Sequence, residues 1–149
     1  MLDNEVIQHS HSPWNSPMFL VPKKGGKFRP VVDFRKVNLH TTKDPMPIPV
    51  MGDILKSIGN GNKMFSTLDL KSAFWQIELD PESKAVTAFS TDRGHFEFNR
   101  MPFGLKNAPS TLQRLMNQLF NKELGRSLFV YLYDLIVFSP TVEQHLDTL

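Results

Sequence analysis

Two aspartates lie within apolar runs that are typical of β-strands, a setting in which carboxylates can hold metal ions. Asp69 lies near the end of residues 64–70, and Asp134 interrupts residues 128–138. Burying a carboxylate is costly unless it is paired or bound to a cation, and hard cations such as Mg²⁺ prefer carboxylate oxygens. The alternative is that each aspartate ends a strand and faces solvent. The two residues alone leave both interpretations open.

A basic segment between residues 21 and 38 is the second feature that suggests chemistry. It contains one acid, Asp33, and six cations: Lys23, Lys24, Lys27, Arg29, Arg35 and Lys36. Such a segment is either a solvated face or an arm that contacts phosphates. The formal net charge of the whole chain is only +2, so the chain is not a polycation and the local clustering carries the argument.

The composition indicates a globular protein without disulfides or thiolate metal sites. Hydrophobic residues make up 40% and charged residues 21% of 149 residues, and cysteine is absent. One compact domain, or two small lobes, is expected at this length. Residues 128–138 are too short to span a bilayer, and the N-terminus lacks a signal-peptide pattern. We expect an intracellular protein, cytoplasmic or nuclear, with no membrane partner.

Local patterns predict elements that would position these residues. Residues 5–20 suggest an extended arm, and the runs VPKK and FRPVVDF around Gly25-Gly26 suggest a hairpin. Prolines exclude regular structure over 43–49, and 50–58 has helical spacing. Two β-like runs, 85–90 and 95–99, flank a turn at 91–94.

The carboxylates fall in the second half of this pattern. A strand over 65–70 is followed by a short helix over 71–75, and two strands surround a tight turn within 128–138. An apolar stripe predicts a helix over 105–124, with Leu112, Leu115, Met116, Leu119 and Phe120 on one side. A last helix starts near Glu143. The fold class expected from this mixture is α+β.

Five segments in series carry a family resemblance: SPWNSP, KFRPVVDFRKVN, FSTLDLKSAFWQIEL, AFSTDRGHFEFNRMPFGLKNAPSTLQRLMN and FVYLYDLIVFS. Together they closely resemble reverse transcriptases of the Ty3/gypsy type of long-terminal-repeat retrotransposon, over essentially all of residues 1–149. The resemblance implies a right-hand polymerase fold in which an antiparallel palm sheet packs on helices. Fingers would cover approximately 1–42 and 77–104, and palm approximately 43–76 and 105–149, with the thumb absent.

The resemblance implies an RNA-directed DNA polymerase that uses two Mg²⁺ ions to transfer a deoxynucleoside triphosphate onto a primer 3′-hydroxyl. Asp69, the Leu70 carbonyl and Asp134 match the family's metal ligands. The family's Tyr-X-Asp-Asp turn reads YLYD here, so Tyr133 replaces one ligand aspartate. A phenol has a pKa near 10 and stays neutral at pH 7. We therefore expect weak or absent Mg²⁺ binding and impaired catalysis.

Other family positions carry over by resemblance. The residues matched to nucleotide binding are Lys23, Lys24, Arg29, Ser72, Ala73, Phe74 and Phe103. Those matched to template contact are Asp33, Arg35, Gly104 and Gln113, the last on the polar side of the long helix. Two alternatives stay open: Asp33 and Arg35 form a structural pair, and Phe74 is a core aromatic.

The implied partners are an RNA or DNA template–primer and a deoxynucleoside triphosphate, with self-association through exposed palm strands. Three hypotheses follow. The chain is a catalytically impaired reverse-transcriptase domain, a repurposed nucleic-acid-binding or protein-interaction module, or a subunit completed by another chain.

Overall fold

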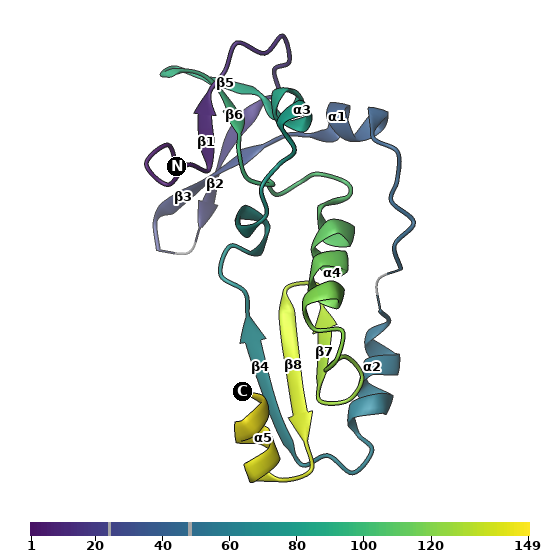
Figure 1. Ribbon diagram of the computed structural model, residues 1–149. Helices are drawn as coiled ribbons and strands as arrows, with labels where there is room; N and C mark the ends of the chain where they lie inside the picture. The colour runs from purple at the N-terminus through teal and green to yellow at the C-terminus, as the bar shows by residue number, and fades with distance from the viewer. Residues whose placement is uncertain (24, 48) are drawn as a thin grey trace. The chain divides into compact units, whose positions relative to one another are not determined.

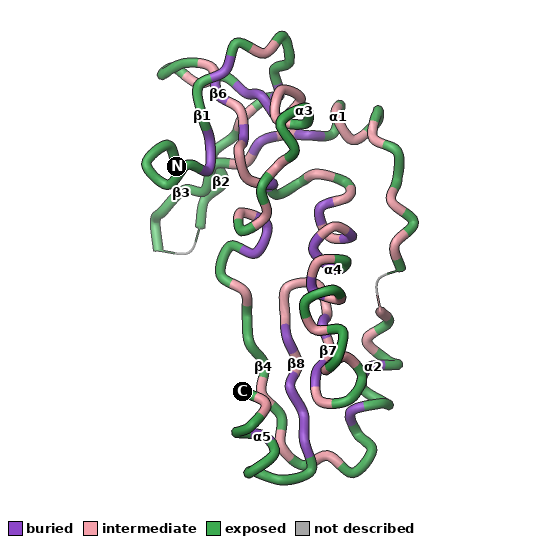
Figure 2. The backbone as a smooth tube through the Cα atoms, viewed as in Figure 1, coloured by how far each residue is buried: buried purple, intermediate pink, exposed green. Residues whose placement is uncertain are grey.

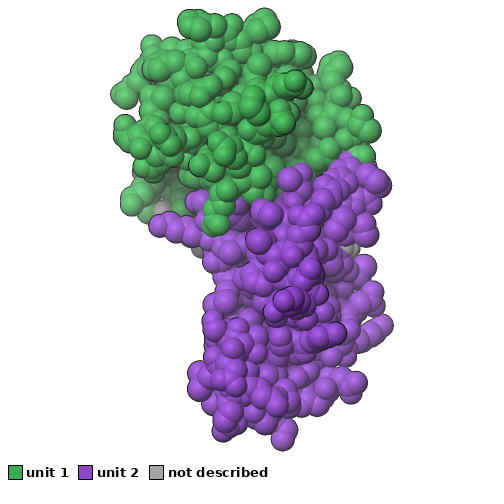
Figure 3. Space-filling view, in the orientation of Figure 1, with its two compact units in different colours: residues 1–43, 74–108 green, residues 44–73, 109–149 purple. Residues whose placement is uncertain are grey.

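The computed structural model describes residues 1–23, 25–47 and 49–149, which form two compact units. Unit 1 comprises Met1–Lys43 and Phe74–Ala108, and unit 2 comprises Asp44–Ala73 and Pro109–Leu149 (Figure 3). Each unit is therefore assembled from two separate segments of the chain. Both carboxylates singled out above belong to unit 2, and the basic segment belongs to unit 1.

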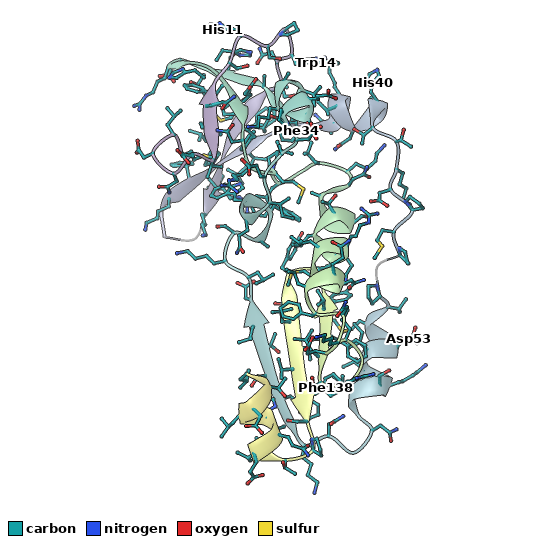
Figure 4. The ribbon with its side chains drawn as sticks, viewed as in Figure 1. His11, Trp14, Phe34, His40, Asp53 and Phe138 are labelled. Atoms are coloured by element: carbon teal, nitrogen blue, oxygen red, sulfur yellow. The ribbon has the colours of Figure 1, made fainter. Side chains whose placement is uncertain are left out.

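Unit 1 is built around a three-stranded antiparallel sheet in the order β1-β6-β5 (Figure 1). Its strands are β1 (Ile7–His9), β5 (Phe89–Thr91) and β6 (Gly94–Phe98). An aromatic and aliphatic core forms on this sheet, with Val6, Ile7, Val32, Phe34, Phe89, Phe96 and Phe98 buried. Phe34, labelled in Figure 4, is only 2% exposed. The extended arm expected over 5–20 thus contains a strand that closes one edge of this sheet.

The predicted hairpin around Gly25-Gly26 is confirmed. Strands β2 (Met18–Lys23) and β3 (Lys27–Val32) pair antiparallel, and both glycines have positive φ, 90° and 73°. Glycine adopts that conformation without the steric cost of a Cβ atom. Helix α1 (Arg35–His40) follows β3 directly.

The prediction of a strand over 85–90 is wrong for residues 85–87, and β5 begins only at Phe89. Residues Pro81–Lys84 form a short helix, α3, and Ala85–Thr87 form a 3₁₀ turn, η2. The Asp80 side chain accepts the Glu82 N–H at 3.0 Å, and Pro81 occupies the first turn, a combination that starts helices. Thr87 is buried, and its hydroxyl accepts the Phe98 N–H at 3.0 Å, which ties the turn to β6.

Unit 2 contains an antiparallel sheet in the order β4-β8-β7. Its strands are β4 (Met64–Asp69), β7 (Leu128–Tyr131) and β8 (Asp134–Ser139), as predicted for both segments. One face carries Phe129, Ile136 and Phe138, and helix α2 (Met51–Ile58) packs on it through Ile54 and Ile58. Figure 4 labels Phe138 of β8 and Asp53 of α2. The opposite face is aliphatic, with Leu128, Val130, Leu135 and Val137 buried.

The remaining helices are shorter than or close to their expected lengths. Helix α4 spans Ala108–Leu119 rather than 105–124, because the chain turns at residues 120–127 before β7. The short helix expected after Asp69 is the 3₁₀ turn η1 (Ala73–Gln76), and the last helix is α5 (Val142–Thr148). In the part of the chain that the structure describes, no helix is long and apolar enough to cross a membrane.

Candidate active site

Asp69 and Asp134 lie directly opposite each other in the antiparallel pair β4–β8. Side chains of directly opposed residues project from the same face of a sheet, with Cβ atoms about 4.5–5.5 Å apart. Asp69 is exposed and Asp134 half-buried. Among the described residues, neither carboxylate has a hydrogen-bond or ion-pair partner. The sheet therefore places two unpaired carboxylates side by side at one end of its aromatic face.

A tight turn brings Tyr133 next to this pair. Tyr131 of β7 pairs with Asp134 of β8, so the loop holds only Leu132 and Tyr133. Leu132 has φ 57°, which at the first position of a two-residue hairpin loop is typical of a type II′ turn. The Tyr133 carbonyl accepts the Leu70 N–H at 3.2 Å. Asp69, Leu70, Tyr133 and Asp134 are thus neighbours in unit 2.

The segment after Asp69 has an unusual backbone. Ser72 has φ 52°, in the left-handed region that non-glycine residues rarely adopt. It precedes η1, whose first residue Ala73 is 4% exposed. Such outliers persist where surrounding structure holds them, and they cluster at binding sites. The exposed Ser72 is compatible with the predicted contact to phosphate oxygens, which stays a prediction.

Phe74 and Phe103, both in unit 1, pack edge to face with ring centroids 5.0 Å apart. Phe74 is 2% exposed and Phe103 is 48% exposed. The burial of Phe74 favours the alternative that it is a core aromatic, and Phe103 is the member of the pair that offers a surface to a ligand.

The β2–β3 register sorts the basic residues onto one face of the hairpin. Lys23 pairs with Lys27, and Arg29 pairs with Val21, so all three cations project from the same side. Like charges directly opposite each other are destabilising, and a bound anion would relieve the repulsion between the two lysines. Lys24, also predicted to bind nucleotide, lies outside the described residues.

The opposite face of the hairpin is apolar. Leu20 and Phe28 are 61% and 64% exposed, and Pro22 and Pro30 pair with Phe28 and Leu20. Each proline removes a backbone donor, which hinders the addition of another strand.

Asp33 and Arg35 form the structural pair that the sequence left as an alternative. Arg35 Nη2 lies 2.6 Å from Asp33 Oδ2, and Arg35 Nε donates to the same carboxylate. These hydrogen bonds hold the pKa of Asp33 below its ordinary value. Both residues line a shallow pocket of about 370 Å³ in unit 1, whose other lining residues are Phe19, Val31, Val32, Phe34, Asn38 and Gly104.

Gly104 occupies this pocket wall with φ 94°, where any side chain would be strained. Asn38 holds the loop around Gly104. Its Nδ2 donates to the Gly104 carbonyl at 2.8 Å, and its Oδ1 accepts the Lys106 N–H at 2.7 Å. Lys106 also donates from Nζ to the Thr41 carbonyl at 2.8 Å. No local pattern marks Asn38, because its partners lie more than 60 positions away.

Gln113 corrects the expected orientation of α4. It was placed on the polar side of the helix, but it is 1% exposed, whereas Leu119 of the predicted apolar stripe is 64% exposed. Gln113 Nε2 donates to Asn117 Oδ1 at 2.9 Å and lies 3.4 Å from the Val130 carbonyl. Hydrogen bonds to the helix and to β7 satisfy this donor, whereas Gln113 Oε1 is buried without a hydrogen-bond partner among the described residues. The side chain leaves no surface for a template.

Comparisons with known proteins decide the family. The family described as reverse transcriptase (RNA-dependent DNA polymerase) matches residues 21–149. The chain belongs to the reverse transcriptase family.

Relatives of this reverse transcriptase domain include transposon polyproteins. It is 47% identical over 154 residues to a retrovirus-related Pol polyprotein from transposon 297 of Drosophila melanogaster, with 100% of the chain aligned. It is 40% identical over 151 residues to the corresponding polyprotein from transposon gypsy of the same organism, with 97% of the chain aligned. The chain spans 14% of the length of each of these two relatives.

Solved structures of reverse transcriptases have the same fold. The native protease–reverse transcriptase of prototype foamy virus superposes with a TM-score of 0.87 at 27% identity, over 99% of this chain and 19% of that one. A foamy viral protease–reverse transcriptase in complex with RNA/DNA hybrid gives a TM-score of 0.84 at 26% identity. This match covers 99% of this chain and 19% of the foamy viral chain. The mixed helices and antiparallel sheets expected from the sequence are therefore confirmed as a reverse transcriptase fold.

Reverse transcriptases generally use Mg²⁺, and around Asp69 and Asp134 the described residues supply fewer carboxylates than a two-ion centre needs. Two ions held about 3.5–4 Å apart require several shared carboxylate oxygens. Among the described residues, no group of three or more His, Cys, Asp or Glu side chains could hold a metal. Asp69 and Asp134 supply two carboxylates, and the neighbouring position in the turn is the phenol of Tyr133.

Proposed function

We propose that this chain is the fingers and palm of a Ty3/gypsy-type reverse transcriptase in which Tyr133 impairs the polymerase centre. Unit 1 would be the fingers and unit 2 the palm. The observation that carries the proposal is the direct opposition of Asp69 and Asp134 beside a turn that reads YLYD. The chain would retain the scaffold of the family and lack one carboxylate of the site.

Tyrosine is a poor substitute for that carboxylate. Its oxygen is neutral at pH 7, whereas Mg²⁺ prefers charged or carbonyl oxygens in octahedral geometry. Phosphoryl transfer depends mainly on positioning and on electrostatic stabilisation of the transition state. Loss of one hydrogen-bond donor to a transition state typically costs about 10²–10³ in rate, and loss of a metal ligand should cost at least as much. We therefore expect DNA synthesis by this chain to be at background.

Binding of nucleic acid does not require the missing carboxylate. Lys23, Lys27 and Arg29 share one exposed face and suit phosphate groups. The pocket with Asp33, Arg35 and Gly104 would receive a template nucleotide, and the foamy viral relative is described in complex with RNA/DNA hybrid. These features support template–primer as the partner, with Lys23 and Arg29 contacting the incoming triphosphate.

A repurposed nucleic-acid-binding module is the second candidate. The basic face of β2–β3 favours it, since that face is complete while the acidic site is not. A chain completed by another subunit would likewise bind nucleic acid without performing chemistry at Tyr133.

The Tyr133→Asp variant tests the proposal. Mn²⁺, a spectroscopic stand-in for Mg²⁺, is titrated while broadening of Asp69 and Asp134 resonances is followed by NMR. We expect the reversion to raise affinity at this site by at least about tenfold, the scale on which even an outer-shell partner acts. Carried in a protein that also supplies a thumb, it should restore primer extension. The matched control is Leu132→Asp, which adds the same charge one position away.

Each outcome separates the candidates. Equal Mn²⁺ affinity in Tyr133→Asp and Leu132→Asp would mean that position 133 is not a ligand position. Primer extension by the unmodified chain would contradict the proposal outright. Restored metal binding without synthesis, together with tight template binding, would favour the repurposed module.

A further inference from the structure

Strand β4 carries Asp69 but contains little that fixes its position in the sheet. None of its six residues is buried, and Phe65 and Leu68 are 51% and 44% exposed. By contrast, four of the six residues of β8 are buried; Figure 2 shows this difference along the two strands. Strand register is strongly specified where one face is buried and weakly specified elsewhere. Hydrophobic burial alone therefore leaves the register of β4 weakly determined.

No turn fixes this register either. The β7–β8 pair is set by its two-residue loop, as in any tight hairpin. Asp69 and Asp134 are paired although they lie 65 positions apart in the sequence. Backbone hydrogen bonds close both ends of the β4–β8 pair, from Lys63 N–H to the Ser139 carbonyl and from Leu70 N–H to the Tyr133 carbonyl. Such bonds can form in any register, because they involve no side chains.

A buried histidine supplies the missing specificity. His145 of α5 is 5% exposed, and its two ring nitrogens lie 2.8 Å from Ser66 Oγ of β4 and 2.7 Å from Ser139 Oγ of β8. Ser139 Oγ also lies 3.3 Å from the Thr141 carbonyl. A neutral imidazole protonated on Nδ1 satisfies this arrangement: Ser66 donates to Nε2, Nδ1 donates to Ser139, and Ser139 donates to Thr141.

We infer that His145 is a positioning residue that locks β4 and β8 in the register that places Asp69 opposite Asp134. Ser66 and Asp69 lie on opposite faces of β4, and a slip of one residue would move each side chain to the face opposite its own. A slip of two residues would keep the face but move Ser66 by about 7 Å, beyond hydrogen-bonding reach of His145. Only the observed register satisfies both hydroxyls. The consequence for a metal site rests on the proposed function; the lock itself does not.

Disulfide trapping can report the register, because the chain contains no cysteine of its own. Ile136→Cys is combined in turn with Thr67→Cys, its observed partner, and with Phe65→Cys or Asp69→Cys, which become partners after a two-residue slip. All three β4 positions share one face. Brief oxidation followed by quantification of each disulfide gives the ratio of off-register to in-register pairing.

The test variants remove one or both hydrogen bonds. Ser66→Ala removes the hydrogen bond to His145. Ser66→Thr retains a hydroxyl at this position and should keep the off-register ratio of the parent. His145→Phe removes both while keeping a ring of similar size. We expect the off-register ratio to rise about fivefold in both Ser66→Ala and His145→Phe, if the Ser66–His145 hydrogen bond contributes its usual net amount, because the Ser139–His145 bond does not involve β4 and forms in every register. Thr141→Ala is the matched control, because it weakens the start of α5, where Thr141 caps the Gln144 N–H, without changing the two serines.

The inference is overturned if folded Ser66→Ala keeps the off-register ratio of the parent, or if Thr141→Ala raises it as much. Should His145→Phe not fold, Ser66→Ala and Ser66→Thr still decide the matter. The outcome is independent of the proposed function, since trapping needs neither metal nor synthesis. If Tyr133→Asp fails to bind Mn²⁺ while the register still depends on His145, the proposed function fails and the lock stands.

Discussion

Asp69 and Asp134 face each other across β4 and β8, and no described side chain neutralises either carboxylate. Two negative charges in directly opposed positions of a sheet repel each other. Such a pair is retained at a cost in stability, as is common where a site is arranged for a ligand rather than for the fold. Removing one of the two charges should therefore raise the free energy of unfolding.

Neutralising one of these carboxylates should stabilise the chain. Asp69→Asn is expected to raise the free energy of unfolding by about 0.2–1 kcal/mol in urea denaturation at low salt, with the gain shrinking as salt screens the charges. The control is the double variant that combines Asp69→Asn with Asp134→Asn. Because the first substitution already removes the repulsion, the second should add nothing to the stability. A full additive gain would show that the two charges do not interact.

The turn at Leu132 should be strained. A left-handed conformation costs a non-glycine residue about 1–2 kcal/mol, which glycine would not incur. Glycine also gives the unfolded chain more conformational entropy, and this offsets about half of that gain. Leu132→Gly should therefore raise the free energy of unfolding by about 0.5–1 kcal/mol, and Leu132→Ile, which is β-branched, should lower it. Leu55→Gly in α2 is the control, since glycine at an exposed helix position destabilises. A loss of stability in Leu132→Gly would argue against strain in this turn.

Acid should weaken the link between Asp44 and Arg114. Asp44 accepts the Met46 N–H at 2.9 Å, and Arg114 Nη2 lies 2.7 Å from Asp44 Oδ2. The Met46 hydrogen bond and then Arg114 lower the pKa of Asp44 from its ordinary value of 3.8. A lowered folded-state pKa means that the stabilisation is complete above that ordinary value and is lost as the pH falls through the lower one.

Denaturation midpoints from about pH 6 to about pH 3 measure this effect, since the interval spans the ordinary carboxyl pKa. Asp44→Asn should lose less stability than the parent over the acid end of the interval. Asp33, whose pKa Arg35 lowers in the same way, remains in both proteins and keeps the comparison matched. Parallel profiles for the two proteins would remove Asp44 from the acid response.

The basic face of the β2–β3 hairpin should govern the salt dependence of nucleic-acid binding. Replacing Lys23, Lys27 and Arg29 with alanine is expected to reduce the log–log salt slope by about 0.7–0.9 for each phosphate that is no longer neutralised. Fluorescence anisotropy of a labelled primer–template gives the slope. Replacement of the exposed Lys56, Lys63 and Lys122 of unit 2 is the charge-matched control. Equal changes in both triple variants would indicate a general effect of net charge.

The sequence by itself determined the elements with strong local signals, and the family through its five ordered segments. The glycine pair predicted the β2–β3 hairpin, and the tight turn predicted β7–β8, because neighbouring residues fix the backbone there. The sequence also indicated that Asp69 and Asp134 lie close together, through the family resemblance rather than through their spacing. Where local signals competed, as at residues 85–87, a 3₁₀ turn that continues the capped helix α3 prevailed over β-like composition.

Only the tertiary structure decided which polar side chains are buried and what they hold. Gln113, expected on the polar side of the long helix, is buried, with its Nε2 3.4 Å from the Val130 carbonyl. His145 is also buried, and it contacts the hydroxyl of Ser66, 79 positions away in the sequence. The β4–β8 register that places Asp69 opposite Asp134 has the same origin. Hydrogen bonds between distant segments depend on the folded chain bringing them together, and no local periodicity encodes that encounter.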